Sequence, residues 1–437
     1  MESNLNLNQN NVKKFNYSLF VSLMLLNFVP TVYETIKVFF VNNTVASLDV
    51  VSQIEWFDLI DEVLTSSLTI PLYYLLNKYI DNKDNFKEKV FHSGLITFIV
   101  YGVFSVLIYF QAKNLSVFMG ASNIGELTRY LQLETIAFVI GILYTFCSVV
   151  FILIGKSKYI YCFLVLKTIG LIIGDFLLIP RFGSFGVAYA NMFTNFILAI
   201  SSFILLVKDD SISFSFKTIS DKLFFVDWAR VGLFEAGQIF LDNYIYAVMV
   251  CKMVNEVQQQ GNYWIANNFI WGWLLVPSFA LAGIIKRDCK DGYEKLNQKA
   301  YKKVIVATII VWIISIPLWN LIFGRLMGVK NVSDIFYIVI CLLPFYITYL
   351  VSSYIDNIFY GLGKTHYTMF ISFVVNVVYY GIVYILFKNG MFTPSINFII
   401  MMFGGGMVVH LIVSICIKKI CLDCAKPIGL NLKELKS

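Results

Sequence analysis

The chain has 437 residues, of which 58% are hydrophobic, 17% aromatic and only 14% charged, with a mean hydropathy of +0.74. Soluble domains carry about 25% charged residues, so this composition excludes a soluble globular protein. The net charge of +7 does not indicate a nucleic-acid-binding surface, because the Lys and Arg residues lie in short segments between apolar runs.

Twelve apolar runs are long enough to cross a bilayer, which requires about 20 mostly apolar residues. They lie at approximately residues 17–41, 46–77, 91–111, 126–154, 159–180, 185–207, 225–251, 258–285, 301–323, 333–361, 367–388 and 392–417. We therefore predict an all-α integral membrane protein with twelve transmembrane helices. Prolines inside a span free a backbone carbonyl and permit a bend, and they occur at Pro30, Pro71, Pro277, Pro317 and Pro344.

The basic residues predict the orientation of the spans. With the N-terminus inside, 25 of the 34 Lys and Arg residues fall in inside segments and 7 in outside segments, while Lys37 and Lys167 lie within spans. Cytoplasmic segments carry the excess of basic residues in membrane proteins, so we expect both termini to be cytoplasmic.

A motif that occurs twice divides the chain. Each copy has a Met-Gly step and, 35 residues later, a Gly-Lys step: Met119-Gly120 and Gly155-Lys156, then Met327-Gly328 and Gly363-Lys364. The copies are 208 residues apart, close to half the chain, and each half contains six predicted spans. An even number of spans makes the repeats parallel, and we expect two lobes around a central cleft. We place the lobes at residues 1–215 and 216–437.

Acidic residues lie within the predicted spans, where each ionisable group costs roughly 2.5–3.5 kcal/mol at the bilayer centre and is functional by default. Adding the repeat offset to Glu34 gives Asp242, so these two carboxylates occupy equivalent places in the two halves. Trp56 and Trp264 obey the same offset, whereas Asp175 corresponds to Val383. A cavity lined by such acids favours Na⁺, H⁺ and organic cations.

Further candidates for a substrate cleft lie in the second, tenth and eleventh spans. Glu55, Asp58 and Glu62 share one face of a helix and predict either a cation-binding strip on the cleft or a wet outer vestibule. Asp356 lies in the middle of its span, where it binds substrate or pairs with a polar neighbour such as Asn376.

Two further charged residues lie in neighbouring predicted spans. Lys167 and Glu134 both lie within predicted spans, and their spacing is compatible with a structural ion pair.

The segment from Phe118 to Val207 resembles the multidrug and toxic compound extrusion (MATE) transporters. The resemblance rests on the order of a Met-Gly step, a long span, a short Gly-Lys-Ser loop, a span that ends in Asp175-Phe-Leu-Leu-Ile-Pro, and the Gly- and Ala-rich stretch from Gly183 to Asn191. Gly363-Lys364-Thr365 is its clearest point in the second half, and the order of spans extends it over essentially the whole chain.

The resemblance implies a cation-coupling site in the first half. Glu34 occupies the place of an acidic residue that serves cation coupling in the family, Asp175 matches its partner acid, and Asn191 matches a Thr position; Asp242 is the second-half counterpart. Oxygens of Glu34, Asp175 and Asn191 could together hold a hard cation. The family has an Asn four residues before the Asp, where this chain has Leu171, which leaves both Na⁺ and H⁺ open.

The function predicted from these features is a secondary active transporter that exports organic cations or amphiphiles by antiport with Na⁺ or H⁺. No nucleotide-binding loop, metal-ligand cluster or nucleophile constellation occurs in the sequence, so we expect no enzyme activity, no cofactor and no metal site. We expect a monomer in the bacterial inner membrane.

Three alternatives remain. The same superfamily contains flippases for lipid-linked saccharides, whose anionic substrates would require basic residues in the cavity. The second alternative belongs to another functional class: a membrane scaffold or receptor without transport activity. A twelve-helix major-facilitator carrier lacks support, because its loop signature is absent between Asn77 and Lys89.

Overall fold

The computed structural model describes residues 14–213, 222–289 and 292–423. The described residues form helices and no strand, so the predicted all-α class is confirmed. The predicted boundary between the halves, at residues 215 and 216, lies outside the described residues. The α-helices are α2 (Tyr17–Asn43), α3 (Leu48–Val51), α4 (Ile54–Leu75), α5 (Lys83–Phe118), α6 (Ile124–Leu153), α7 (Ser157–Phe182), α8 (Ser184–Lys208), α9 (Lys222–Tyr246), α10 (Lys252–Glu256), α11 (Gln260–Phe269), α12 (Val276–Asp288), α13 (Gln298–Leu321), α14 (Val332–Gly361), α15 (Thr365–Phe373), α16 (Tyr380–Lys388) and α17 (Ile396–Lys418).

Most of the predicted spans are helices long and apolar enough to cross a membrane. Ten described helices meet that condition, and the bent pair Gln260–Leu274 and Val276–Asp288 makes eleven. The pair bends by 50° at a break beside Pro277, one of the prolines expected to permit a bend. The remaining predicted span, the seventh at residues 225–251, corresponds to α9 and the turn after it, whose charged residues, such as Asp227 and Arg230, make it less apolar.

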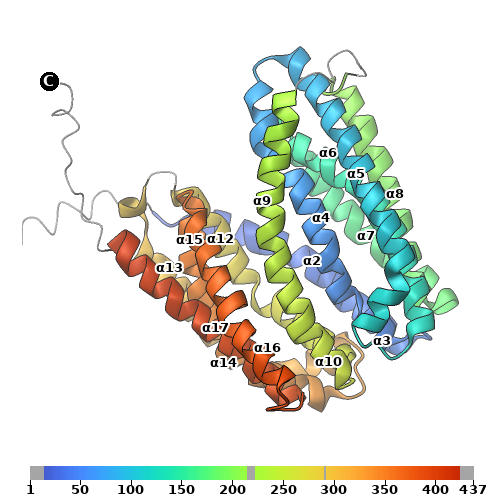
Figure 1. Cartoon of the computed structure of the whole chain (residues 1–437), viewed down its shortest axis with the longest axis vertical. Coiled ribbons are helices and arrows are strands. Elements are labelled where there is room, and N and C mark those ends of the chain that lie inside the picture. Colours follow the sequence, from blue (N-terminus) through green and yellow to red (C-terminus); the bar gives the residue numbers. More distant parts are fainter. Residues whose placement is uncertain (1–13, 214–221, 290–291, 424–437) are drawn as a thin grey trace, which may run out of the picture.

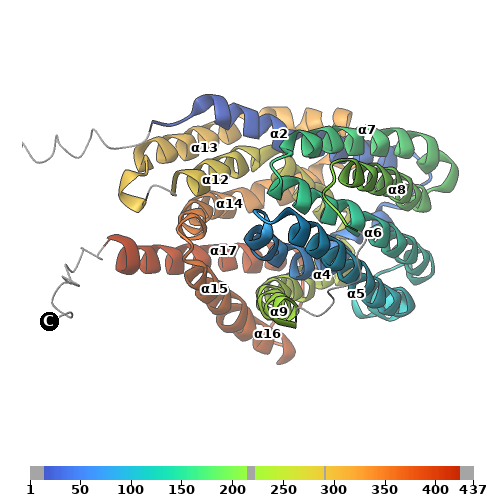
Figure 2. The same cartoon turned by 90° about the horizontal axis from the view of Figure 1, so that it is seen from above.

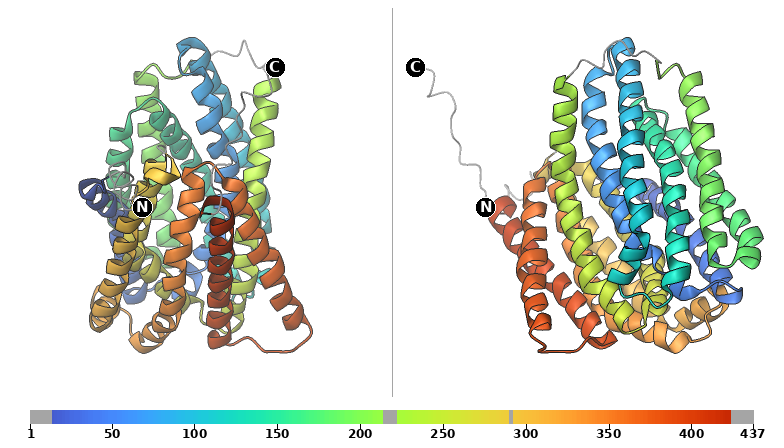
Figure 3. Two further views of the ribbon diagram at one scale, coloured as in Figure 1. Left: turned by 90° about the vertical axis from the view of Figure 1, so that its left-hand side faces the viewer. Right: turned by 45° about the vertical axis from the view of Figure 1, so that its right-hand side comes forward.

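The axes of the long helices are broadly aligned, and the connecting loops lie at the two ends of the molecule (Figure 3). On one side of the molecule α5, α6, α7 and α8 pack together, and on the other side α12, α14 and α17 do so (Figure 1). Two helices connect these groups, because α2 packs against α12 as well as α7, and α9 packs along α4. The repeat offset relates α2 to α9 and α4 to α11 and α12, so the two connections are equivalent. In Figure 2, α2 and α9 lie at opposite edges of the molecule.

The glycines of the repeated motif end helices. Gly120, Gly155, Gly328 and Gly363 have φ values between 63° and 75°, a conformation that glycine adopts without steric cost. The backbone N–H of the residue after Gly155 donates to the carbonyl of Phe151 at 2.8 Å, and its equivalent after Gly363 repeats this bond at 2.8 Å. This six-residue closure is the Schellman turn. The repeated motif therefore marks the same helix ends in both halves of the chain.

Large apolar side chains cover the outer surface of the helices. On α5 alone, Phe98, Val103, Phe104, Leu107 and Phe110 are exposed. A continuous apolar surface of this kind is a liability in water and is stable against lipid chains. Together with the apolar helices, it supports a multi-pass membrane protein.

Candidate functional site

A central cavity with a volume of about 690 Å³ lies between the two halves. Its wall contains six of the predicted site residues: Glu34, Glu55, Asp58, Asp242, Asp356 and Asn376. Glu62 adds a sixth carboxylate, whereas the basic side chains on the wall are Lys37 and His410. The central cavity is therefore acidic.

A second, inner cavity of about 420 Å³ lies within the first half. It shares Glu34, Lys37 and Asp58 with the central cavity and adds the polar side chains Asp61, Lys167 and Asn191, among others. These three charged side chains, together with Ile54, therefore form the boundary between the two cavities, and a charge there can act on both.

Glu34 is paired with a lysine on the same helix. The Nζ atom of Lys37 lies 2.7 Å from Oε2 and 2.9 Å from Oε1 of Glu34, one turn away on α2. The lysine is 8% exposed. Sequence reasoning noted Lys37 within a span but assigned it no role, and the i,i+3 spacing to Glu34 was the available signal.

Asp175 and Asn191 do not meet Glu34 in one ligand set. Asp175, on α7, is fully buried, and neither of its carboxylate oxygens has a hydrogen-bond partner within the described part of the chain. Asn191, on α8, donates from Nδ2 to both carboxylate oxygens of Glu134, at 3.0 and 2.9 Å. In the described structure no hydrogen bond joins Glu34, Asp175 and Asn191; Glu34 and Asn191 both line the inner cavity, and Asp175 does not.

The predicted ion pair of Lys167 with Glu134 is not formed among the residues described. The amide of Asn191 donates to Glu134 instead. Lys167 lies on the wall of the inner cavity, which also carries the carboxylates of Asp58 and Asp61. The sequence could not distinguish these partners, because Asn191 and Lys167 come from different helices that both pack near α6.

Glu55 connects the first half to the second. Its carboxylate accepts hydrogen bonds from the Tyr246 hydroxyl at 2.8 Å, the Gln260 amide at 3.0 Å and the Asn267 amide at 2.8 Å. All three donors belong to the second half, so Glu55 is not a free acid on the cleft. Of its predicted neighbours on the helix face, Asp58 is exposed to the cavities and Glu62 accepts from Asn243 at 2.9 Å.

A buried amide pair strengthens this junction. Gln53 and Asn255 exchange hydrogen bonds of 2.7 and 2.9 Å, and Asn255 also donates to the carbonyl of Met119 at 3.0 Å. Both amides are almost completely buried. We call Glu55, Gln53 and their second-half partners the end clamp.

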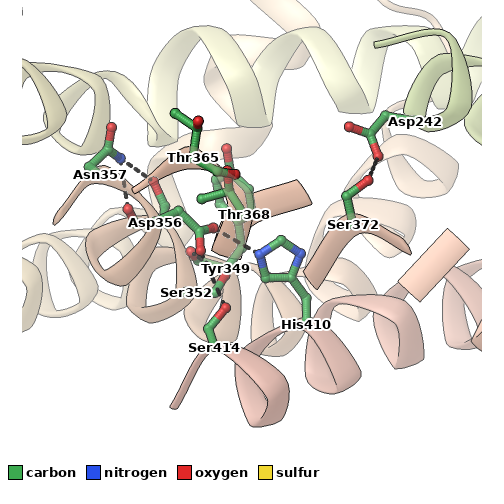
Figure 4. A network of polar contacts seen from close by, with 11 residues as sticks. Asp242, Tyr349, Ser352, Asp356, Asn357, Thr365, Thr368, Ser372, His410 and Ser414 are labelled. Atoms are coloured by element: carbon green, nitrogen blue, oxygen red, sulfur yellow. Dashed lines mark hydrogen bonds and ion pairs between the residues drawn. The ribbon is translucent and has the colours of Figure 1, made fainter. Parts of the chain in front are cut away.

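A polar network in the second half holds the remaining candidates (Figure 4). Asp242 accepts hydrogen bonds from the Ser372 hydroxyl and from the amide of Asn376. Asp356 does not pair with Asn376 in the described structure; its Oδ2 lies 2.8 Å from Nε2 of His410.

His410 was not assigned a role from the sequence. It lies on α17 one turn before Ser414, whose hydroxyl donates to Oδ1 of Asp356 at 3.3 Å. The i,i+4 spacing of these two polar residues in an apolar span was the signal that could have found it.

The described residues contain no group of three or more His, Cys, Asp and Glu side chains that could hold a metal ion. The acids of the cavities have separate partners instead: Glu34 pairs with an ammonium group, Asp356 with a histidine, and Glu55 and Asp242 with amides and hydroxyls.

No family model matches the sequence, and no curated protein matches it. Solved structures do match. The chain resembles the inward-facing conformation of a multidrug resistance MATE family transporter of the MOP superfamily with a TM-score of 0.76 at 16% identity, over 91% of this chain and 96% of the other. The outward-facing conformation of such a transporter gives 0.66 at 16% identity, over 92% and 94%.

A third structure is that of a MOP superfamily transporter from Pyrococcus furiosus, for which a reversed polarity of the binding pocket is described. It matches with a TM-score of 0.64 at 16% identity, over 92% of this chain and 95% of that one. The fold is thus that of the MATE transporters of the MOP superfamily. The predicted resemblance and fold class, with twelve helices in two lobes, are confirmed at the level of the fold.

Proposed function

We propose that the protein is a secondary active transporter that exports organic cations or cationic amphiphiles by antiport with Na⁺ or H⁺. The observation that carries the proposal is the acidic cavity between the two halves, because a cavity lined by one sign of charge concentrates ligands of the opposite sign. The MATE fold supports a transporter rather than a catalyst. We expect it to act as a monomer in the plasma membrane, with both termini cytoplasmic.

Transport would proceed by alternating access of the two halves. The end clamp joins the halves at one end of the cavity, and with cytoplasmic termini this is the outer end. The greater similarity to an inward-facing than to an outward-facing structure agrees with this assignment. To open outward, the protein must break the end clamp and form other contacts at the inner end.

The coupling cation would act on the acids of the first half. A cation that enters from outside and neutralises Glu34 and Asp175 changes the packing of α2 against its neighbours. It shifts the two-state equilibrium only by the difference between its affinities for the two states. Asp242, the counterpart of Glu34 in the second half, lines the central cavity. There a cationic substrate would contact Asp58, Asp356 and the clamped Glu55.

The alternative within the superfamily is a flippase for a lipid-linked saccharide. Binding of a pyrophosphate group requires Arg or Lys donors in the cavity. Lys37 is the lysine on the central wall, and it is already paired with Glu34. The charge of the cavity therefore favours cationic substrates.

The experiment compares ethidium efflux from cells that produce the wild-type protein, Glu34→Gln or Glu126→Gln. Glu126 lies outside both cavities and accepts a hydrogen bond from Ser184 at 2.7 Å, so its variant is the matched control. We expect efflux to be lost in Glu34→Gln and retained in the control. Undiminished, ion-dependent efflux by Glu34→Gln would contradict the role of Glu34.

A further inference from the structure

Lys37 occupies the boundary between the central and the inner cavity. Both oxygens of the Glu34 carboxylate lie within 2.9 Å of its ammonium group. The ring of Tyr33 lies 5.2 Å and that of Trp264 5.6 Å from the same nitrogen. Two aromatic faces and a carboxylate form a complete binding site for a monovalent cation.

Two further acids of the first half act on this ammonium group. Asp58 shares the walls of both cavities with Lys37, and the buried Asp175 acts on it electrostatically. Asp175 contributes a fully buried carboxylate. No hydrogen bond of standard geometry reaches its oxygens in the described structure, and the groups that act on it most strongly are the ammonium group of Lys37 and the hydroxyl of Tyr33. Lys37 is therefore placed where it neutralises a cluster of carboxylates rather than a single one.

The repeat shows that the fold does not need a lysine here. The offset of 208 residues relates Glu34 to Asp242 and Lys37 to Ile245. In the second half, the neutral donors Ser372 and Asn376 stabilise Asp242, and no ammonium group is paired with it in the described structure. Lys37 is thus an addition to the first half only, at the place where the proposed function requires a cation.

We propose that Lys37 is a resident cation: a tethered ammonium group that takes the place of a coupling cation beside Glu34, with Asp58 and Asp175 adding to the negative potential there. Like charges at this separation repel strongly in a poorly polarisable site, so the ammonium group excludes Na⁺. Lys37 is then the residue that determines ion specificity, and transport by this protein needs no Na⁺. This inference rests on the proposed function and selects between its two coupling ions.

Removal of the ammonium group should open the site to Na⁺. Lys37→Met keeps the length of the side chain and leaves Glu34 without its ion-pair partner, while Asp58 keeps Lys167 on the wall of the inner cavity. The Glu34 side chain is 33% exposed, so water from the cavities can hydrate it and the variant is expected to fold. Glu34→Gln/Lys37→Met removes both charges of the pair and controls for folding.

The test measures binding of radioactive Na⁺ to purified protein in lipid nanodiscs, together with thermal unfolding in NaCl and in choline chloride at equal ionic strength. The wild-type protein should show no saturable Na⁺ binding and the same unfolding midpoint in both salts. Lys37→Met should bind Na⁺ saturably and unfold at a higher temperature in NaCl, because a ligand that binds only the folded state stabilises it. Binding should be absent again in Glu34→Gln/Lys37→Met.

Lys167→Met is the matched control. Lys167 is a second lysine on the inner cavity and acts on the same acids, but in its variant Glu34 keeps the ammonium group of Lys37, so Na⁺ binding should not appear. Saturable Na⁺ binding by the wild-type protein, or its absence from a folded Lys37→Met, would overturn the proposal. A failure of the proposed function would be a separate result. No organic cation would then be transported under either gradient, although the Na⁺-binding results could still be as predicted.

Discussion

The two halves of the molecule hold their intramembrane carboxylates differently. In the second half, Asp242 accepts from Ser372 and Asn376, and Asp356 lies 2.8 Å from a ring nitrogen of His410. Each of these acids has its own short-range partners, and a carboxylate whose hydrogen bonds are satisfied contributes mainly to a fixed geometry.

In the first half, Glu55 and Glu134 also accept hydrogen bonds, but two other acids have fewer partners. Asp175 is fully buried without a hydrogen-bond partner among the described residues, and Glu34 depends on the single ammonium group of Lys37. A buried charge without partners is costly unless a cation neutralises it. The comparison suggests that the response to cations belongs to the first half and that the second half mainly shapes the cavity.

The largest effect is expected for Asp175→Asn. Removal of this buried charge should reduce gradient-driven transport at least about tenfold, as for an intramembrane acid that binds the coupling ion. Thermal stability should stay the same or rise, because the variant no longer buries an unpaired charge. Flux into proteoliposomes and the unfolding midpoint measure the two effects. Transport at the wild-type rate would show that the two halves do not differ in this way.

The end clamp joins the two regions and should give the next largest effect. Glu55→Ala leaves three second-half donors without their acceptor, at a cost of about 1–3 kcal/mol, so the population open to the outside should rise about tenfold or more. Labelling of Ser352→Cys, in the central cavity, by an impermeant thiol reagent added outside would measure this shift.

Glu62→Ala is the control for the clamp. Glu62 is exposed and accepts from Asn243, so its loss should change the labelling of Ser352→Cys far less. Equal labelling in both variants would mean that Glu55 does not keep the outer end closed.

A smaller effect is expected for Asp242→Asn. The variant keeps an acceptor oxygen for Ser372 and Asn376 but removes one negative charge from the central cavity. Screened attraction across such a cavity amounts to about 1 kcal/mol, so KM for a monovalent cationic substrate should rise a few-fold while coupling to the ion gradient remains. If Asp242→Asn uncouples transport as Asp175→Asn does, the two halves are functionally equivalent.

The smallest effect is expected for His410→Gln. The Gln side chain can still donate to Asp356, which also retains the hydroxyl of Ser414. KM should therefore change by less than about twofold, as for substitutions that preserve a hydrogen bond. A large loss of transport would indicate that His410 itself takes part in coupling and that the second half is not merely a scaffold.

The fold was largely predictable because its signals are local. Apolar runs, basic loops and the repeated glycines at Gly120 and Gly328 act within a few residues, and each glycine ends a helix at positive φ. The acids of the cleft could likewise be found, because a charge inside an apolar span is conspicuous. The partners could not be found in this way, because they come from distant parts of the chain.

Two acids illustrate this limit. Glu55 appeared to be a free acid on a helix face, and only the approach of Tyr246 and Gln260 from the other half makes it a clamp. Asn191 carries the right chemistry for a cation ligand, but a neighbouring helix supplies Glu134 as its partner. Packing between helices, which a hydropathy pattern does not encode, decides both cases.

The most direct test of the central claim is flux of a fluorescent organic cation into proteoliposomes with a proton gradient or a Na⁺ gradient imposed separately, for the wild-type protein and Asp175→Asn. We predict that the proton gradient alone drives accumulation by the wild-type protein and that Asp175→Asn abolishes it. Accumulation that persists in Asp175→Asn, or that is the same with every gradient collapsed, would contradict a coupling site in the first half.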